Sequence, residues 1–309
     1  VGDSPGNVFG NVAAVMEESG ISQAAEEAGA SMLLFEDGRI AEFGSPSGNR
    51  RVKKIRLAKS ALEADVIINL PKLKTHNLTL FTGAIKNMYG MVPGFEKGNY
   101  HKQAIRAKEL SEVVVDIFQL SRPALSIMDA VVGMEGHGPA GGEPRKLGLI
   151  IASSDAVALD AAASYLIGFD PLRIYTTAIA FRRGLGEARL DRIEFPGIPL
   201  SGLVRDNWKK SSDLISRIDW VPSFIFDLIK PLTNLINVNP GIDQEKCTQC
   251  MVCVNNCPAK TIDYFEERKQ VVIDLEDCIH CFCCHELCAY KAIELKRTWL
   301  MEKLGLGDV

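Results

Sequence analysis

The chain has 309 residues, 47% of them hydrophobic and 24% charged, and its formal net charge is -4. These values suit a globular protein of about two domains with a sizeable core, and they exclude a strongly basic nucleic-acid-binding protein. All nine cysteines lie between Cys247 and Cys288, a distribution too uneven for a disulfide framework. It favours metal binding in a reducing compartment, so we expect a cytoplasmic protein whose metal sites are kept from oxygen.

The chain starts with Val1-Gly2-Asp3, a sequence typical of a strand that runs into a loop. It has no initial Met, and no basic segment followed by an apolar run that would indicate a signal peptide. We therefore expect the chain to begin inside a domain whose N-terminal part is missing.

Short apolar runs alternate with helical patterns over residues 1–201, which predicts an α/β layered domain with a mostly parallel sheet. Gly20 is expected to end the first helix, while Asp155 and Gly168 are expected to begin and end a later one. The run at 52–58 alternates apolar and basic residues, so one strand face is solvated. In chain order we expect a helix at 11–19, strands at 31–35 and 52–58, strands buried on both faces at 65–70, 125–132 and 147–152, and a helix at 155–167.

Residues 202–240 predict a helical connector that is broken by Pro222, Pro231 and Pro240. Its apolar part, 220–231, is too short and too interrupted to cross a bilayer, so no transmembrane segment is expected. We expect this part to form a helix packed between domains, with an interfacial helix as the alternative. Residues 298–309 form a C-terminal tail.

A repeat of 31 residues occupies 241–297 and predicts a small pseudo-symmetric domain. Each unit contains four cysteines with the same spacing, Cys247-x2-Cys250-x2-Cys253-x3-Cys257 in the first and Cys278-x2-Cys281-x2-Cys284-x3-Cys288 in the second. Three cysteines at two-residue gaps can surround one iron–sulfur cluster, while the fourth, set apart, serves the other cluster.

The repeat therefore predicts two [4Fe-4S] clusters, one held by Cys247, Cys250, Cys253 and Cys288 and the other by Cys278, Cys281, Cys284 and Cys257. Residues 241–297 resemble the bacterial two-cluster ferredoxin, which implies a small α+β fold and one-electron transfer at low potential. Ala289 stands where that family has proline. Two zinc sites are the alternative, and the ninth cysteine, Cys283, is expected to pack beside the ligands.

Motifs along the remainder of the chain resemble the domain of unknown function 362 family, whose members are often joined to a two-cluster ferredoxin. The resemblance covers nearly the whole chain and depends on four stretches: GDSPG at 2–6, DVIINLPKLKTH at 65–76, TGAIKNMYG at 82–90 and MEGHGP at 134–139. The family implies the architecture without naming a reaction.

Nine basic and two acidic residues lie between Arg50 and Lys86, which favours an anionic ligand such as a phosphate, a carboxylate or the acidic ferredoxin domain itself. For residues 50–59 a solvated strand face is the simpler interpretation. Lys72, Lys74 and Lys86 follow an expected buried strand, where open α/β sheets bind ligands. Three histidines in or near glycine-containing loops are candidate acids, bases or metal ligands, namely His76, His101 and His137, the last beside Glu135.

Gly83, Gly90 and Gly94 would allow backbone amides to approach a ligand, although simple turns explain them equally well. Residues 65–101 also resemble a segment of the nickel-pincer lactate racemases, in the spacing of His76, Lys86 and His101. That resemblance implies a shared site location, with a catalytic histidine, a cofactor-carrying lysine and a nickel-binding histidine. No arginine follows Gly2-Asp3 as it does in the racemases.

The leading hypothesis is an iron–sulfur oxidoreductase that exchanges electrons between a redox partner protein, or another low-potential donor, and an anionic small molecule on the α/β domain. The alternatives are a non-catalytic electron carrier or cluster-assembly partner, and non-redox chemistry of a metal or nucleotide cofactor at residues 76–101. No G-x-G-x-x-G follows a strand, so NAD is not indicated. The sequence does not indicate an oligomeric state.

Overall fold

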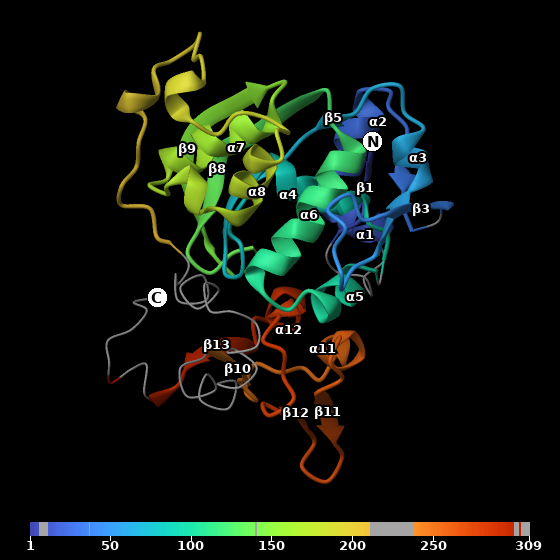
Figure 1. Ribbon diagram of the computed structural model, residues 1–309. Helices are drawn as coiled ribbons and strands as arrows, with labels where there is room; N and C mark the ends of the chain where they lie inside the picture. The colour runs from blue at the N-terminus through green and yellow to red at the C-terminus, as the bar shows by residue number, and fades with distance from the viewer. Residues whose placement is uncertain are drawn as a thin grey trace.

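The computed structural model describes residues 1–5, 12–36, 38–94, 96–139, 141–210, 238–299 and 303 (Figure 1). A larger α/β part contains the elements up to η4 (Leu200–Gly202), and a smaller part contains the elements from β10 (Val238–Ile242) onward. The predicted 220–231 helix and most of the predicted tail lie outside the described residues. Within the described residues, no helix is both long and apolar enough to cross a bilayer.

The central sheet is built around the long strand β8 (Leu125–Glu135). β5 (Ile68–Asn69) and β6 (Lys72–His76) pair with β8 in parallel, while β9 (Glu143–Ser153) pairs with it antiparallel and β7 (Leu80–Thr82) pairs antiparallel with β6. The sheet is therefore mixed, and the expectation of a mostly parallel sheet is not confirmed. The connections from β6 to β7 and from β8 to β9 are too short for a crossover, and short connections produce antiparallel neighbours.

Helices cover one face of this sheet (Figure 1). α7 (Ala156–Leu166) packs on β8 and β9, and α6 (Ala107–Ser121) and α8 (Tyr175–Arg182) pack on each other. Asp155 caps α7 by accepting hydrogen bonds from Val157 N and Ala158 N, as predicted. The other helices of this part are α1 (Val12–Glu18), α2 (Ile21–Glu27), α3 (Lys59–Leu62), α4 (Ala84–Asn87) and α5 (Glu96–Gln103), and the 3-10 turns are η1 (Met88–Met91), η2 (Pro171–Arg173), η3 (Leu190–Arg192) and η4.

The opposite face of the sheet is exposed where the sequence predicted burial. Val66, Ile68 and Leu70 are 62%, 56% and 64% exposed, and Ile150 is 69% exposed. Val131 and Val132 of β8 are 42% and 39% exposed. The prediction that 65–70, 125–132 and 147–152 are buried on both faces is therefore wrong. Apolar runs indicate a strand, but they do not reveal whether helices cover one face or two.

The N-terminal region adds two small sheets. β1 (Gly2–Asp3) pairs in parallel with β2 (Leu33–Leu34), and β3 (Ile40–Gly44) pairs antiparallel with β4 (Lys54–Ala58). β4 buries Ile55 and Leu57 and leaves Lys54 exposed, so the prediction of a strand with one solvated face is correct.

The smaller part has the expected α+β repeat. β10 pairs with β13 (Ile293–Arg297), β11 (Ile262–Phe265) pairs with β12 (Gln270–Ile273), and α11 (Val252–Asn256) contacts α12 (Cys283–Leu287). Left-handed backbone occurs at Gln249, Met251 and Lys260, and again 31 residues later at His280, Phe282 and Lys291. The sequence repeat is therefore also a repeat of backbone conformation.

Pro240 belongs to β10 instead of breaking a helix, so the predicted connector is wrong at its C-terminal end. Proline has no N–H to donate, and it is tolerated in this two-stranded sheet, where each strand is an edge.

Candidate functional site

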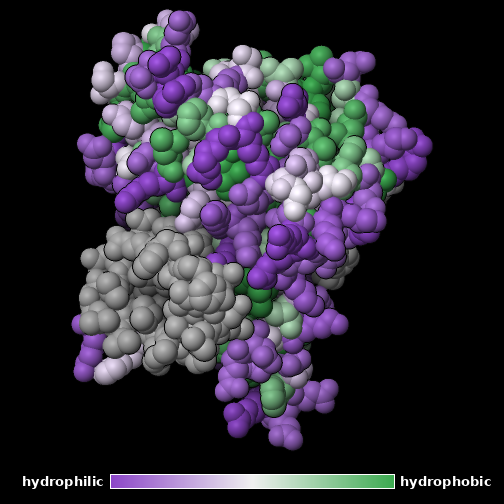
Figure 2. All heavy atoms as spheres, viewed as in Figure 1, coloured by the Kyte–Doolittle hydropathy of each residue, from purple (hydrophilic) through white to green (hydrophobic). Residues whose placement is uncertain are grey.

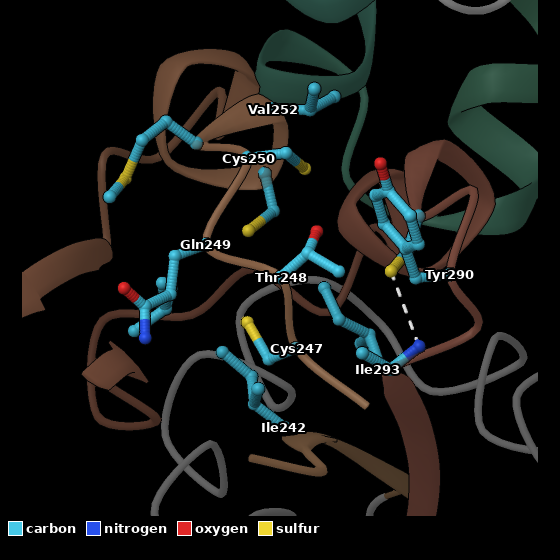
Figure 3. Close-up of a pocket in the computed structure, with 13 residues that line it drawn as sticks. Ile242, Cys247, Thr248, Gln249, Cys250, Val252, Tyr290 and Ile293 are labelled. Carbon is cyan, nitrogen blue, oxygen red and sulfur yellow. Dashed lines mark hydrogen bonds between the residues drawn. The ribbon is translucent and has the colours of Figure 1, made fainter. Parts of the chain in front are cut away.

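The cysteines surround two cavities in the smaller part of the chain. Cys247, Cys250, Cys253 and Cys288 line the first, and Cys257, Cys278, Cys281 and Cys284 line the second. Figure 3 shows Cys247 and Cys250 of the first cavity together with its lining residues. The structure thus groups the eight cysteines as the spacing predicts, with one distant cysteine crossing to each cavity.

The cavity walls suit an iron–sulfur cluster. Backbone N–H groups donate to three thiols: Thr261 N to Cys257 Sγ at 3.3 Å, His280 N to Cys278 Sγ at 3.4 Å, and Ala292 N to Cys288 Sγ at 3.3 Å (the dashed line in Figure 3). Such bonds favour thiolates and influence a cluster's potential.

Cys283 is not among the residues that line either cavity. It lies on α12, close enough to Lys86 and Tyr89 of the α/β part to influence their pKa values. This position agrees with the predicted packing of Cys283 beside the ligands, and it shows that α12 lies against the larger part.

His76 ends β6 and is buried. Its Nδ1 accepts hydrogen bonds from Leu78 N at 3.0 Å and from Thr79 N at 3.3 Å, so the hydrogen of the neutral ring is on Nε2. Burial, followed by the charges of Lys86, His101 and Lys74, lowers the pKa of His76 well below 6.5. This geometry makes His76 a neutral N–H donor at Nε2.

Lys74 lies on β6 and Lys86 lies on α4, and the positive charge of each lowers the pKa of His76. Burial lowers the pKa of both lysines. Among the described residues, no carboxylate lies within the 4.0 Å ion-pair distance of either ammonium group, in contrast to Lys72 and to Lys54 of β4. Partly buried cations without an adjacent counterion favour an anionic ligand.

His101 on α5 completes this group of residues. Its ring lies edge-on to Tyr89, with the centroids 6.2 Å apart, and the Lys86 ammonium lies 5.9 Å from the Tyr89 centroid. Burial, and secondarily the charge of Lys86, lowers the pKa of His101 to about 4, so the ring is neutral at pH 7. The structure brings Lys74, His76, Lys86 and His101 together, and these four residues are called the basic pocket below.

Several predicted site residues have other roles. Lys72 pairs with Asp129 at 2.7 Å on the exposed face of the sheet, and Glu135 pairs with Arg145 at 2.6 Å and accepts from Lys209 N. His137 lies in the loop from β8 to β9, outside the basic pocket. Four basic residues between positions 50 and 59 form ion pairs at the surface, as expected for a solvated strand face. They are Arg51, Lys54, Arg56 and Lys59.

Gly83 does not present amides to a ligand. The N–H groups of Ala84 and Ile85 donate to the Asp160 carboxylate of α7 instead, and a Cβ on Gly83 would overlap that carboxylate. Gly90 similarly allows close approach of the Asp3 carboxylate. These glycines therefore serve side-chain packing, which a sequence alone does not distinguish from ligand binding.

Sequence reasoning missed Lys97 on α5, which is 7% exposed. Its Nζ donates to the carbonyl oxygen of Ser4 and, at 2.7 Å, to Ser4 Oγ, and burial lowers the pKa of Lys97 to about 8. Lys97 thereby attaches the GDSPG stretch to α5. Its sequence context, EKGNYHKQ, is that of a solvated helix and contains no signal for burial.

Sequence reasoning also missed Glu286, which extends from α12 to the basic pocket. Glu286 Oε1 lies 3.8 Å from His76 Nε2. Burial raises the pKa of Glu286 to about 7, against the opposing charges of Lys86 and Lys74. On the same helix, His285 Nε2 lies so near Gly141 that a Cβ there would be 2.6 Å away. In Figure 1, α12 is the part of the smaller domain directly beneath the α/β part.

Comparison with known proteins identifies both parts of the chain. Residues 1–165 match the domain of unknown function DUF362, and residues 246–292 match the 4Fe-4S dicluster domain. The thylakoid-associated protein sll1697 of Synechocystis is 38% identical over 210 residues, which are 68% of this chain and 63% of that protein. The chain thus spans less than two thirds of this curated relative.

The dicluster match means that the smaller part is an iron–sulfur domain of the ferredoxin type, which carries electrons and binds a 4Fe-4S cluster. The match to DUF362 covers more than half of the chain and includes every residue of the basic pocket. The chain therefore belongs to the DUF362 family, with a C-terminal ferredoxin domain.

Proposed function

We propose that this protein is an iron–sulfur oxidoreductase in which two [4Fe-4S] clusters exchange electrons with an anionic substrate or second cofactor in the basic pocket. The observation that carries the proposal is the position of α12. Cys284 of the second cavity and Glu286, which lies 3.8 Å from His76 through its carboxylate, are two residues apart on this helix. A cluster in the second cavity would therefore lie next to the pocket.

The pocket residues can stabilise an anion and supply a proton. His76 Nε2–H is a neutral donor whose orientation is set by the two backbone bonds to Nδ1. Lys74 and Lys86 provide positive charge, and their lowered pKa values make proton donation easier than from a solvated lysine. A [4Fe-4S] cluster supplies one-electron transfer at low potential. These residues would neutralise the charge that develops on a substrate as it is reduced.

The direct test follows cluster oxidation in the full chain under anaerobic conditions. The clusters are reduced with dithionite, excess reductant is removed, and pools of anionic metabolites are added while the cluster absorbance and electron paramagnetic resonance signals are recorded. We expect at least one pool to reoxidise the protein, and Lys86→Met to slow this reaction without changing the iron content.

Lys72→Met is the matched control, because Lys72 is a lysine of the same region whose charge is already paired with Asp129 on the exposed face. Equal reoxidation of the Lys86→Met variant and the unsubstituted chain by every pool would refute the pocket as the site of electron exchange. The protein would then be interpreted as an electron carrier or a cluster-assembly partner.

A second function is favoured by the grouping of Lys86 and His101 around Tyr89, with His76 near enough for both residues to influence its pKa. This arrangement suits an organic cofactor attached to Lys86, with non-redox chemistry in the pocket. The intact mass of the protein from its native source tests this alternative. Added mass on Lys86 would support it, and an unmodified lysine in active protein would refute it.

We infer that the electron donor is a one-electron carrier protein in the cytoplasm. The cyanobacterial relative is named as thylakoid-associated, so a donor at a membrane surface is the competing case. Co-sedimentation of the reduced protein with membranes from its source would distinguish the two locations.

A further inference from the structure

The basic pocket already contains a carboxylate, which belongs to the protein itself. Glu286 Oε1 lies 3.8 Å from His76 Nε2, and the charges of Lys86 and Lys74 both act on the Glu286 carboxyl group. His76 presents an N–H at this nitrogen because its Nδ1 is occupied by two backbone donors. The position of Glu286 therefore shows that a carboxyl group fits beside His76 in this conformation.

The contact with Glu286 is loose. A separation of 3.8 Å is longer than a hydrogen bond, and among the described residues neither pocket lysine lies within ion-pair distance of Glu286. The Glu286 side chain is 26% exposed, so part of it already reaches solvent. A competing anion would have to displace only this one side chain, while the helix that carries it could stay in place.

The pocket is a poor match for a phosphate group. Protein phosphate sites commonly use several backbone N–H groups at the start of a helix or in a glycine-rich turn. The corresponding groups here, Ala84 N and Ile85 N, already donate to Asp160 at 2.5 and 3.0 Å. The side-chain donors of the pocket are one imidazole N–H and two ammonium groups, which suit the two oxygens of a carboxylate.

We propose that a small organic acid binds in the basic pocket with its carboxylate in the place held by Glu286, whose side chain turns toward solvent. This inference rests on the proposed function, because it names the class of the substrate exchanged with the ferredoxin domain. Glu286 acts as an internal competitor, because its side chain occupies the place that an anion from solvent would take. Only an anion that binds more strongly than Glu286 would displace it. A bound acid would then lie beside His76, Lys74 and Lys86, next to the second cysteine-lined cavity.

The test measures carboxylate binding directly, using trifluoroacetate as the probe and fluorine NMR of the anaerobic full chain as the readout. We expect Glu286→Ala and Glu286→Gln each to bind trifluoroacetate about tenfold more tightly than the unsubstituted chain, because the internal competitor is removed. Glu267→Ala is the control: it removes an exposed carboxylate of the same domain at the turn between β11 and β12. It should leave the affinity unchanged.

Competition then identifies the chemical class. Acetate should displace trifluoroacetate from Glu286→Ala at lower concentration than inorganic phosphate, and adding Lys86→Met should abolish the gain in affinity. Unchanged or weaker binding by both Glu286 variants, or stronger competition by phosphate, would overturn the inference. Gln retains the size of Glu, so Glu286→Gln still tests the inference if Glu286→Ala fails to fold.

The same samples separate this inference from the proposed redox function. Tighter carboxylate binding without reoxidation of the clusters by any organic acid would support the carboxylate site and refute electron exchange there. Reoxidation by a phosphate ester with no change in trifluoroacetate affinity would support electron exchange and overturn the carboxylate site.

Discussion

Replacing Asp160 by asparagine tests how the α/β domain holds the turn that carries Lys86. Asp160 is 1% exposed, and its carboxylate accepts hydrogen bonds from Ala84 N at 2.5 Å and from Ile85 N at 3.0 Å. Burial nevertheless raises the pKa of Asp160 from 3.8 to about 7, because the two backbone donors offset only part of the lost hydration.

The raised pKa determines whether the unfolding free energy rises or falls with pH. The folded state binds the Asp160 proton more tightly than the unfolded state does, so this stabilisation is fully present below about pH 4 and is lost as the pH rises through about 7. Integrating between pH 5 and pH 8 with these two pKa values gives a loss of about 3 kcal/mol from the unfolding free energy.

An asparagine side chain cannot ionise, so the Asp160→Asn variant should lack this contribution. The assay is anaerobic urea unfolding at pH 5 and pH 8, followed by tryptophan fluorescence, because Trp208 is buried in the same domain. We expect the unsubstituted chain to lose about 3 kcal/mol more than the variant between the two pH values. Equal losses would refute the assignment of a raised pKa to Asp160, whatever the absolute stability of the variant.

Three further predictions concern neighbouring features. Gly83→Ala should destabilise the protein by about 3 kcal/mol in the same urea assay, because its Cβ would overlap the carboxylate on α7, whereas Gly98→Ala, which meets nothing within 4 Å, should not. Nitrogen NMR should show His76 neutral, with hydrogen on Nε2, at pH 7, and a protonated ring at that pH would contradict the backbone bonds to Nδ1. Iron analysis should show that Cys284→Ser reduces the iron content from about eight to about four atoms per chain. Cys283→Ser should keep all of it, and an equal loss would make Cys283 a ligand.

The cysteine grouping was predictable because it depends on local spacing and on a repeat. Cysteines three positions apart in a tight loop face the same volume wherever the loop lies, and the left-handed residues at matching positions of the two units follow from the duplication. The grouping of His76, Lys86 and His101 was implied by the resemblance of residues 65–101 to a segment of the nickel-pincer lactate racemases.

The features that the sequence did not predict depend on contacts between distant segments. No local pattern reveals that α12 lies against His76, since Glu286 is 210 residues further along the chain. The same holds for Lys97, which is buried by residues from the start of the chain, and for Gly83, whose role is decided by Asp160 on α7. The mixed sheet was missed for a related reason: apolar runs show that strands exist, but they do not set strand direction.

The helix α12 is short, and its surroundings differ at its two ends. Cys284 near its start lines the second cavity, Cys288 just after its end lines the first, and Glu286 between them enters the basic pocket. Moving the Glu286 carboxyl group away from His76 would therefore change the charge distribution near both metal sites, even while the helix stays in place. Occupancy of the pocket should be readable, without any turnover, as a change in the line shape of both cluster signals, which makes the metal centres a built-in spectroscopic reporter of binding.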